Sequence, residues 1–334
     1  MSRIHVLKPG LMTTVQDLGR PGWQRYGVSP GGAADAWALR LANLLTGNPE
    51  GAAALEITAS GPILRFAEPT LMAISGADFE ASVDGGRVPA WRPVWLGTGA
   101  ELAIGAARTG FRCYLAVAGG LAVPRVLGGR GTHLAAGFGG FEGRALRAGD
   151  VLKIGPASAW GKRFTLALAG AEAMVAARWE VGVAVRPKYT NAPVIRVVRG
   201  PQWEAFGVET QTRFLGERFT VDARSDRMGL RLNATGGSLL GEPLPEMVSE
   251  GITTGTVQVP PDGQPIVLLA DRQTVGGYPK IGTVASVDLP LLAQLRAGDT
   301  VAFVEVSVAE AQELFLANER SLATVKQGIA LHAT

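Results

Sequence analysis

The sequence predicts a mainly β protein with two domains of similar kind. The chain has 334 residues, long enough for two cores, and its 45 glycines and 20 prolines require frequent turns. Short apolar segments of strand length stand between these turns. The pentapeptide LRAGD occurs at 146–150 and again at 295–299, each time near the end of one half of the chain. Such an internal echo suggests a repeated β-domain.

The strands are expected from residue 53 onward. Asp84-Gly85 follows one of them and is typical of a two-residue hairpin turn. In the second half, the apolar segment PIVLLA at 265–270 is the clearest strand. The candidate strands of the first half read ALEIT, PILRF, TLMAIS, FEASV, PVWL, ELAIG and FRCYLAVAG.

Two helices interrupt the β pattern. Apolar residues at helical spacing, ended by Gly47 and Pro49, predict a helix over about 33–46. Near the C-terminus, Ser307 and Glu310 form a capping-box pattern ahead of a second, peripheral helix.

The domain boundary is expected between about residues 160 and 195, where strand alternation is lost and prolines gather. We predict a first domain over residues 1–185, including the N-terminal loop and helix. A second domain covers 190–306, and a C-terminal helix covers 307–334.

Composition argues against several functions. The 32 basic and 29 acidic residues nearly cancel and the basic groups are scattered, so nucleic acid is not an expected partner. With one cysteine, Cys113, and three histidines, neither a disulfide nor a Cys/His metal site is expected. The N-terminal residues do not resemble a signal peptide, and no apolar run is long enough to span a membrane. We expect a cytoplasmic protein that binds no metal and no membrane.

The stretch 13–37, TTVQDLGRPGWQRYGVSPGGAADAW, combines turn residues with charged groups directly before the first helix. The unpaired N–H groups at a helix N-terminus attract anions, and Arg20 would offer a planar guanidinium to the same anion. The alternative is structural: Arg20 pairs with Asp17 or Asp35, and the glycines only turn the chain. The residues alone leave these two interpretations even.

Two other stretches are weaker candidates. The glycines of 126–144, VLGGRGTHLAAGFGGFEGR, let the backbone come close to a ligand or to another protein chain, but a set of tight β-turns explains them slightly better. No phosphate-binding GxxxxGK motif accompanies them. At 224–232, RSDRMGLRL, a turn with a polar tip has a structural and a functional interpretation of equal weight.

The most informative stretch is 249–283. Its polar residues fall at the end of the PIVLLA strand and in the loop beyond it, which is a usual place for a site. Gly276-Gly277-Tyr278-Pro279 would fix the direction of Lys280. The alternative is a surface hairpin with a solvated lysine, and the functional interpretation is favoured. The polar residues are Glu250, Gln258, Asp271, Arg272, Gln273, Thr274 and Lys280.

Together these segments resemble the KipA/PxpC family, which comprises the C-type component of bacterial 5-oxoprolinase. The family is also called allophanate hydrolase subunit 2 and is similar to half of the carboxyltransferase domain of urea carboxylase. The family usually reads GSRST where this chain has GGRGT, so Gly129 and Gly131 stand in place of hydroxyl residues. The resemblance runs from residue 9 to about 306 and includes QDLGRPGWQRYGVSPGG, GGFEGRALRAGD, SDRMGLRL and PPDGQPIVLLADRQTVGGYPKIG.

The resemblance implies two cyclophilin-like β-barrel domains with a few peripheral helices. It also implies an ATP-dependent enzyme that hydrolyses 5-oxo-L-proline to L-glutamate together with a B-type (KipI/PxpB-like) and an A-type (PxpA/LamB-like) subunit. One alternative is a biotin-dependent carboxyltransferase subunit, with the biotin on a partner protein because no Met-Lys-Met occurs here. The other is a non-catalytic antagonist of a KipI-like kinase inhibitor.

The expected site follows from this resemblance. Arg20 and the SPGG turn would bind an anion, while Lys280 and Gln273 would face an amide oxygen that gains negative charge. Asp35 or Glu250 would orient the cations or handle protons. The catalytic candidates are Arg20, Asp35, Gln273 and Lys280. The substrate-binding candidates are Gln16, Asp17, Ser29, Pro30, Gly31, Arg227, Glu250 and Tyr278.

Overall fold

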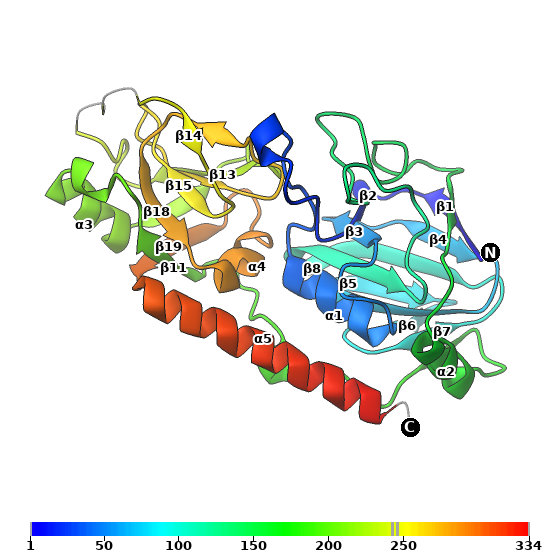
Figure 1. Ribbon diagram of the computed structural model, residues 1–334. Helices are drawn as coiled ribbons and strands as arrows, with labels where there is room; N and C mark the ends of the chain where they lie inside the picture. Colours follow the sequence, from blue (N-terminus) through cyan, green and yellow to red (C-terminus); the bar gives the residue numbers. More distant parts are fainter. Residues whose placement is uncertain (1, 242–243, 245–246, 333–334) are drawn as a thin grey trace. The chain divides into compact units, whose positions relative to one another are not determined.

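The computed structural model describes residues 2–241, 244 and 247–332 and divides the chain into two compact units (Figure 1). The fold is mainly β, as the sequence predicts. Unit 1 consists of Met1–Arg20, Gly31–Pro187 and Ser321–Thr334. Unit 2 consists of Pro21–Pro30 and Lys188–Arg320.

Unit 1 is built on a ten-stranded sheet in the described part of the chain. Its path runs β10-β7-β5-β8-β4-β1-β9, with β2, β3 and β6 paired beside that path. Its helices are α1 (Ala36–Leu45), α2 (Ala159–Leu168) and a 3-10 turn, η2 (Val183–Val185). Its strands are β1 (Arg3–Lys8), β2 (Met12–Gln16), β3 (Ala54–Thr58), β4 (Ile63–Phe66), β5 (Thr70–Val83), β6 (Gly86–Arg87), β7 (Val94–Leu96), β8 (Glu101–Val117), β9 (Val151–Lys153) and β10 (Met174–Ala176).

The two longest strands of unit 1 join segments that the sequence pattern separates. TLMAIS and FEASV form the single strand β5, and ELAIG and FRCYLAVAG form its antiparallel partner β8. The glycines between these segments lie inside the strands, at Gly76 (φ +93°) and Gly110 (φ +72°), where the pairing register shifts. Glycine at positive φ allows a bulge that bends a strand without ending it.

The predicted hairpin turn is confirmed. Asp84 and Gly85 both have positive φ, +49° and +79°, and they join β5 to β6. Val83 and Gly86 pair directly across the turn. Two successive positive φ angles are the condition for the tight hairpin that Asp-Gly favours.

Helix α1 begins at Ala36, later than the predicted start at about residue 33. Asp35 is the N-cap, because its carboxylate accepts a hydrogen bond from the Ala38 N–H at 2.9 Å. The buried face of the helix, which includes Trp37 and Leu41, covers the β5–β8 part of the sheet (Figure 1). The cap therefore fixes where the polar loop ends and the packed helix starts.

Unit 2 contains a closed barrel with the strand order β11-β18-β15-β16-β13-β12-β19 and a separate two-stranded sheet, β14-β17. Its helical segments are η1 (Gln24–Tyr26), η3 (Trp203–Ala205), α3 (Val208–Gly216), η4 (Ser286–Asp288) and α4 (Leu289–Leu292). Its strands are β11 (Val194–Arg199), β12 (Arg218–Val221), β13 (Gly229–Ala234), β14 (Glu250–Gly251), β15 (Thr256–Gln258), β16 (Ile266–Leu268), β17 (Val275–Gly276), β18 (Lys280–Val284) and β19 (Thr300–Glu305).

Helix α3 was not expected from the sequence, although it seals one side of the barrel core. Its buried residues are Thr210 and Phe214, and the Phe214 ring stacks on Phe303 at 4.7 Å between centroids. With so few buried positions, the helical period is too weak to stand out in the sequence.

The repeated LRAGD sequence forms the same turn in both units. In each copy the aspartate carboxylate accepts the arginine main-chain N–H, at 2.7 Å in 146–150 and 2.8 Å in 295–299. The glycine φ angles are +90° and +89°. Each glycine N–H donates to a neighbouring strand, to Val6 at 2.8 Å and to Val221 at 2.9 Å. The turn is therefore the same local structure in two settings.

The C-terminal helix α5 (Val308–Leu331) begins at the predicted capping box. The Ser307 N–H donates to the Glu310 carboxylate at 2.7 Å, and the Glu310 N–H donates to the Ser307 hydroxyl at 3.2 Å. Residues 333 and 334 of the predicted helix lie outside the described residues. Among the residues described, no helix has both the length and the apolar character needed to cross a membrane.

Candidate functional site

Asp17, which follows strand β2, anchors the glycine-rich loop of unit 1. Its carboxylate accepts hydrogen bonds from three main-chain N–H groups, those of Gly19 at 2.8 Å, Arg130 at 2.5 Å and Gly131 at 3.0 Å. The side chain is buried. These bonds tie the loop to the segment after β2, so Asp17 positions the loop, and its role in binding substrate stays a prediction.

Arg20 is fully buried in the same part of unit 1. Its guanidinium donates to the carbonyl of Gly131 and lies 4.8 Å from the centroid of the Phe138 ring. A cation over an aromatic face is held more strongly when both are shielded from water. The loop that Asp17 anchors therefore also fixes the plane of the Arg20 guanidinium.

Gln16 completes this group from the end of strand β2. Its Nε2 donates to the Thr132 carbonyl at 3.1 Å, whereas its Oε1 is buried with no hydrogen-bond partner in the described chain. A Cβ added to Gly131 would lie 2.7 Å from that oxygen. Gly131 thus leaves space near Gln16 Oε1. It provides no hydroxyl donor for that oxygen, whereas the family pattern has a serine at this position.

Two carboxylates occupy the N-terminal end of helix α1. Asp35 caps the helix through Ala38, and Glu56 accepts from the Ala34 N–H at 2.9 Å and from the Tyr114 hydroxyl at 2.8 Å. The Tyr114 oxygen in turn accepts the Asp35 N–H at 2.7 Å. A helix N-terminus stabilises negative charge, and here the protein supplies that charge from its own side chains.

Tyr114 stays protonated in this network. Burial, followed by the charges of Glu56 and Asp35, raises the pKa of its phenol well above the ordinary value. Arg112 adds a buried positive charge, with its Nε 3.9 Å from Glu56 Oε1. The hydroxyl therefore remains a donor to Glu56 at neutral pH, and the network holds the start of α1 in place.

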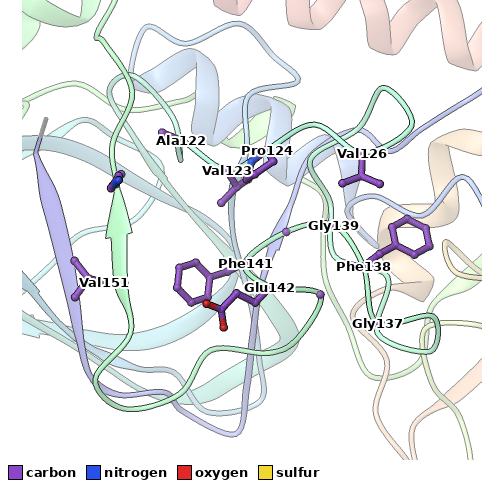
Figure 2. Close-up of a pocket in the computed structure, with 13 residues that line it drawn as sticks. Ala122, Val123, Pro124, Val126, Gly137, Phe138, Gly139, Phe141, Glu142 and Val151 are labelled. Carbon is purple, nitrogen blue, oxygen red and sulfur yellow. The ribbon is translucent and has the colours of Figure 1, made fainter.

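A pocket of about 440 Å³ lies beside the glycine-rich loop of unit 1 (Figure 2). Phe138 and Phe141 supply aromatic surface, and Glu142 and Lys153 are its charged residues. Its volume falls in the range of small-molecule sites. Because Phe138 also packs against Arg20, the pocket and the buried guanidinium share one loop.

In unit 2, Lys280 opens strand β18 with a buried ammonium group. Its Nζ lies 2.5 Å from Glu250 Oε1, and Gln202 Nε2 donates to the same oxygen at 3.2 Å. Gln202 Oε1 also accepts the Lys280 main-chain N–H at 3.1 Å. Pairing of β14 with β17 carries Glu250 to this position.

The two partners of this ion pair differ in exposure. The Lys280 side chain is 6% exposed and the Glu250 side chain 47%. The hydrogen bond and charge of Lys280 lower the pKa of Glu250, so its carboxylate stays ionised at neutral pH. The cation is therefore enclosed, while its counter-ion is about half exposed to solvent.

Tyr278 lies two residues before Lys280 and is half exposed. Its carbonyl accepts a hydrogen bond from the buried Gln258 side chain at 3.4 Å. Gly277, Tyr278 and Pro279 line a pocket of about 190 Å³. The segment predicted to direct Lys280 is thus fixed by a buried amide on one side and borders a small pocket.

Arg227 and Asp271 form a buried bidentate ion pair in unit 2. Nε lies 2.8 Å from Oδ2, and Nη2 lies 3.0 Å from Oδ1. Ser29 donates its hydroxyl to the Ala270 carbonyl at 3.2 Å, which fastens the Pro21–Pro30 segment to the turn after β16. The charge of Arg227 is therefore balanced by the protein itself.

The structure places the predicted site residues in two groups. Unit 1 holds Gln16, Asp17, Arg20, Gly31 and Asp35. Unit 2 holds Ser29, Pro30, Arg227, Glu250, Gln273, Tyr278 and Lys280. Of these, Gln273 is exposed, and Lys280 contacts Glu250 directly. The convergence of Arg20 and Lys280 on one substrate stays a prediction. Within the described ranges, no group of three or more His, Cys, Asp or Glu residues is arranged to hold a metal ion.

Four residues of these groups were missed by the sequence analysis: Glu56, Arg112, Tyr114 and Gln202. A signal existed for Glu56, since a charged residue inside the apolar strand ALEIT is buried only with a partner. Gln202 follows the Gly200-Pro201 turn, and nothing in that pattern marks it.

The fold is that of a carboxyltransferase domain. The structure of Kluyveromyces lactis urea carboxylase is similar to this one, with a TM-score of 0.84 and 29% sequence identity. The matched region covers 98% of this chain and 29% of the urea carboxylase chain. Residues 26–305 match the family described as carboxyltransferase domain, subdomain A and B, and the chain belongs to that family.

Two relatives match over nearly their whole length, and both are named as the C-type component of 5-oxoprolinase. The Haemophilus influenzae protein is 38% identical over 325 residues, which are 97% of this chain and 98% of the relative. The Escherichia coli protein is 38% identical over 310 residues, which are 92% and 93%. The family resemblance inferred from the motifs is thereby confirmed.

Proposed function

We propose that this chain is the C-type component of a bacterial ATP-dependent 5-oxoprolinase, which hydrolyses 5-oxo-L-proline to L-glutamate in the cytoplasm. The whole-length match carries the proposal, because the chain spans 98% and 93% of two proteins that bear this name. It spans only 29% of the urea carboxylase chain. The partners would be a B-type (KipI/PxpB-like) and an A-type (PxpA/LamB-like) subunit, with ATP as the cofactor of the complex.

Opening a lactam places negative charge on the amide oxygen, and the site must stabilise that charge. Lys280 is the group in unit 2 suited to this role. Its ammonium has three N–H donors, and the one bond that it makes to a described residue goes to Glu250, so another donor would serve an amide oxygen. Burial strengthens the interaction, because a shielded charge is less screened than one in water.

Glu250 is suited to orienting Lys280 rather than to taking a proton. Its lowered pKa makes it a weak base at neutral pH. Gln202 holds both partners, through the Glu250 carboxylate and the Lys280 main-chain N–H. The three residues form a preorganised donor at the start of β18.

The test is Lys280→Met in a complex reconstituted with the B-type and A-type subunits. We expect glutamate formation from 5-oxoproline to fall by about 10²-fold or more, the usual cost of losing a donor to a developing oxyanion. Lys188→Met, at an exposed lysine of the same unit, is the matched control and should keep wild-type turnover. Turnover of the Lys280 variant within a few-fold of wild type would contradict the assignment.

A biotin-dependent carboxyltransferase subunit is the second candidate. The family match over residues 26–305 and the urea carboxylase structure support it. The biotin would be attached to a partner protein. Recovery of a biotinylated protein with this chain on a streptavidin blot, together with carboxylation of urea, would favour it. Glutamate formation that requires both ATP and this chain would favour the oxoprolinase.

A further inference from the structure

Arg272 lies in the turn after β16 in unit 2, at the end of the PIVLLA segment. The residue is only 4% exposed. Its Nε and Nη1 atoms are buried and have no hydrogen-bond partner among the residues that the structure describes. A buried guanidinium with unsatisfied N–H groups has lost hydrogen bonds to water without forming others, which costs free energy of folding.

The neighbouring carboxylate does not neutralise Arg272. Asp271 gives both of its oxygens to Arg227, at 2.8 and 3.0 Å. Burial lowers the pKa of Arg272, and no acidic side chain in the described part of the chain forms an ion pair with it. Arg227 and Asp271 cancel, so the turn carries one net positive charge.

Three other arginines in the described chain have buried nitrogens without a hydrogen-bond partner. Arg20 is held by the Gly131 carbonyl and the Phe138 ring, and the other two have a counter-charge. Arg92 forms an ion pair with Glu180, and Arg112 forms one with Glu56. Arginine does not lose its proton to escape the cost of burial, because its pKa lies far above neutral. Among the residues that the structure describes, Arg272 is therefore a buried cation without an anionic partner, and an external anion would compensate the cost of burying its charge.

We propose that Arg272 binds the carboxylate of the substrate, an inference that rests on the proposed 5-oxoprolinase function. A single net charge suits a monoanion such as a carboxylate, whereas phosphate sites usually combine several donors or cations. The hydrogen bond from Ser29 to Ala270 fixes the turn two residues before Arg272. The guanidinium would recognise the acid group, while Lys280 acts on the amide.

The first test uses the full chain alone and follows its melting temperature at constant ionic strength. The probes are 5-oxoproline, sodium acetate, inorganic phosphate and 2-pyrrolidinone, which is the same lactam without the carboxylate. We expect a rise in Tm with the two carboxylates and none with 2-pyrrolidinone. Arg272→Met should abolish the rise, and Arg231→Met, at an exposed arginine on β13, should keep it.

Stability without ligand gives an independent readout. Arg272→Met should melt at or above the wild-type temperature, because it replaces an uncompensated buried charge with an apolar side chain of similar length. A lower Tm for this variant, together with an unchanged response to the carboxylates, would show a structural role and overturn the proposal. A wild-type chain that responds to phosphate alone, or to no probe, would overturn it as well.

The second test separates this proposal from the proposed function. In the reconstituted complex, Arg272→Met should raise KM for 5-oxoproline by at least about 10-fold, the loss of one charge-assisted contact. Arg272→Lys should recover part of that loss. If the wild-type complex forms no glutamate, the oxoprolinase function fails, whereas an Arg272-dependent rise in Tm with acetate still establishes a carboxylate site of another reaction.

Discussion

Asp17→Asn distinguishes a residue that positions the loop from one that contacts substrate. Asparagine keeps the shape but loses the charge, and its NH₂ group would face one of the three N–H donors that now point at the carboxylate. Hydrogen bonds to charged groups contribute about 1.5–3 kcal/mol, against about 1 kcal/mol for neutral ones. Weakening two bonds and reversing the third should destabilise the loop locally by about 3 kcal/mol.

Hydrogen exchange measures this loss where it occurs. Since 1.4 kcal/mol is a factor of ten, the Arg130 and Gly131 amides should exchange about 10²-fold faster in Asp17→Asn. Asp78→Asn, at a half-exposed aspartate of unit 1, should leave these amides unchanged. Exchange within about threefold of wild type would refute the anchoring role. A raised KM for 5-oxoproline with unchanged exchange would instead assign Asp17 to substrate binding.

Three further outcomes follow from the geometry. Asp35→Ala should lower the free energy of unfolding by about 1 kcal/mol through loss of the α1 cap, measured by urea denaturation. Because Lys280 lowers the pKa of Glu250, their pair stabilises the fold above the ordinary glutamate pKa and loses that effect as the pH falls through the lowered value. Glu250→Gln should therefore flatten the pH dependence of stability below about pH 5, and an unchanged slope would contradict the pair. Gly131→Ala should destabilise unit 1 because its Cβ crowds Gln16 Oε1, and Gly131→Ser should recover part of the loss by donating to that oxygen; equal melting temperatures would disprove the second claim.

The features that the sequence predicts well are local ones. The Asp84-Gly85 hairpin and the Ser307–Glu310 capping box each depend on residues a few positions apart. The residue types alone indicate the backbone dihedral angles of the hairpin and the hydrogen bonds of the cap. The sequence predicts two strands where the structure has the single strand β5. A glycine such as Gly76 is typical both of a turn and of a bulge, so the residue type does not distinguish them.

The candidate sites were predictable only in part, because their contacts join distant residues. Lys280 was identified from its loop, but its partner Glu250 is 30 positions away and Gln202 is 78 positions away. Glu56 meets Tyr114 across 58 positions. Strand order and register determine which distant residues come into contact, and the local pattern of apolar residues does not predict either. The unbalanced charge of Arg272 is likewise visible only once Asp271 is seen to bind Arg227.

The two LRAGD turns allow the stability contribution of one turn sequence to be compared in two different surroundings within the same protein. Replacing the aspartate at 150 or at 299 with alanine removes the same hydrogen bond, from the arginine main-chain N–H to the aspartate carboxylate, in two different environments. In the first environment the carboxylate also binds the Arg144 guanidinium at 2.7 Å. The difference between the two losses in the free energy of unfolding would therefore measure how much the surroundings add to a turn whose sequence is the same in both places.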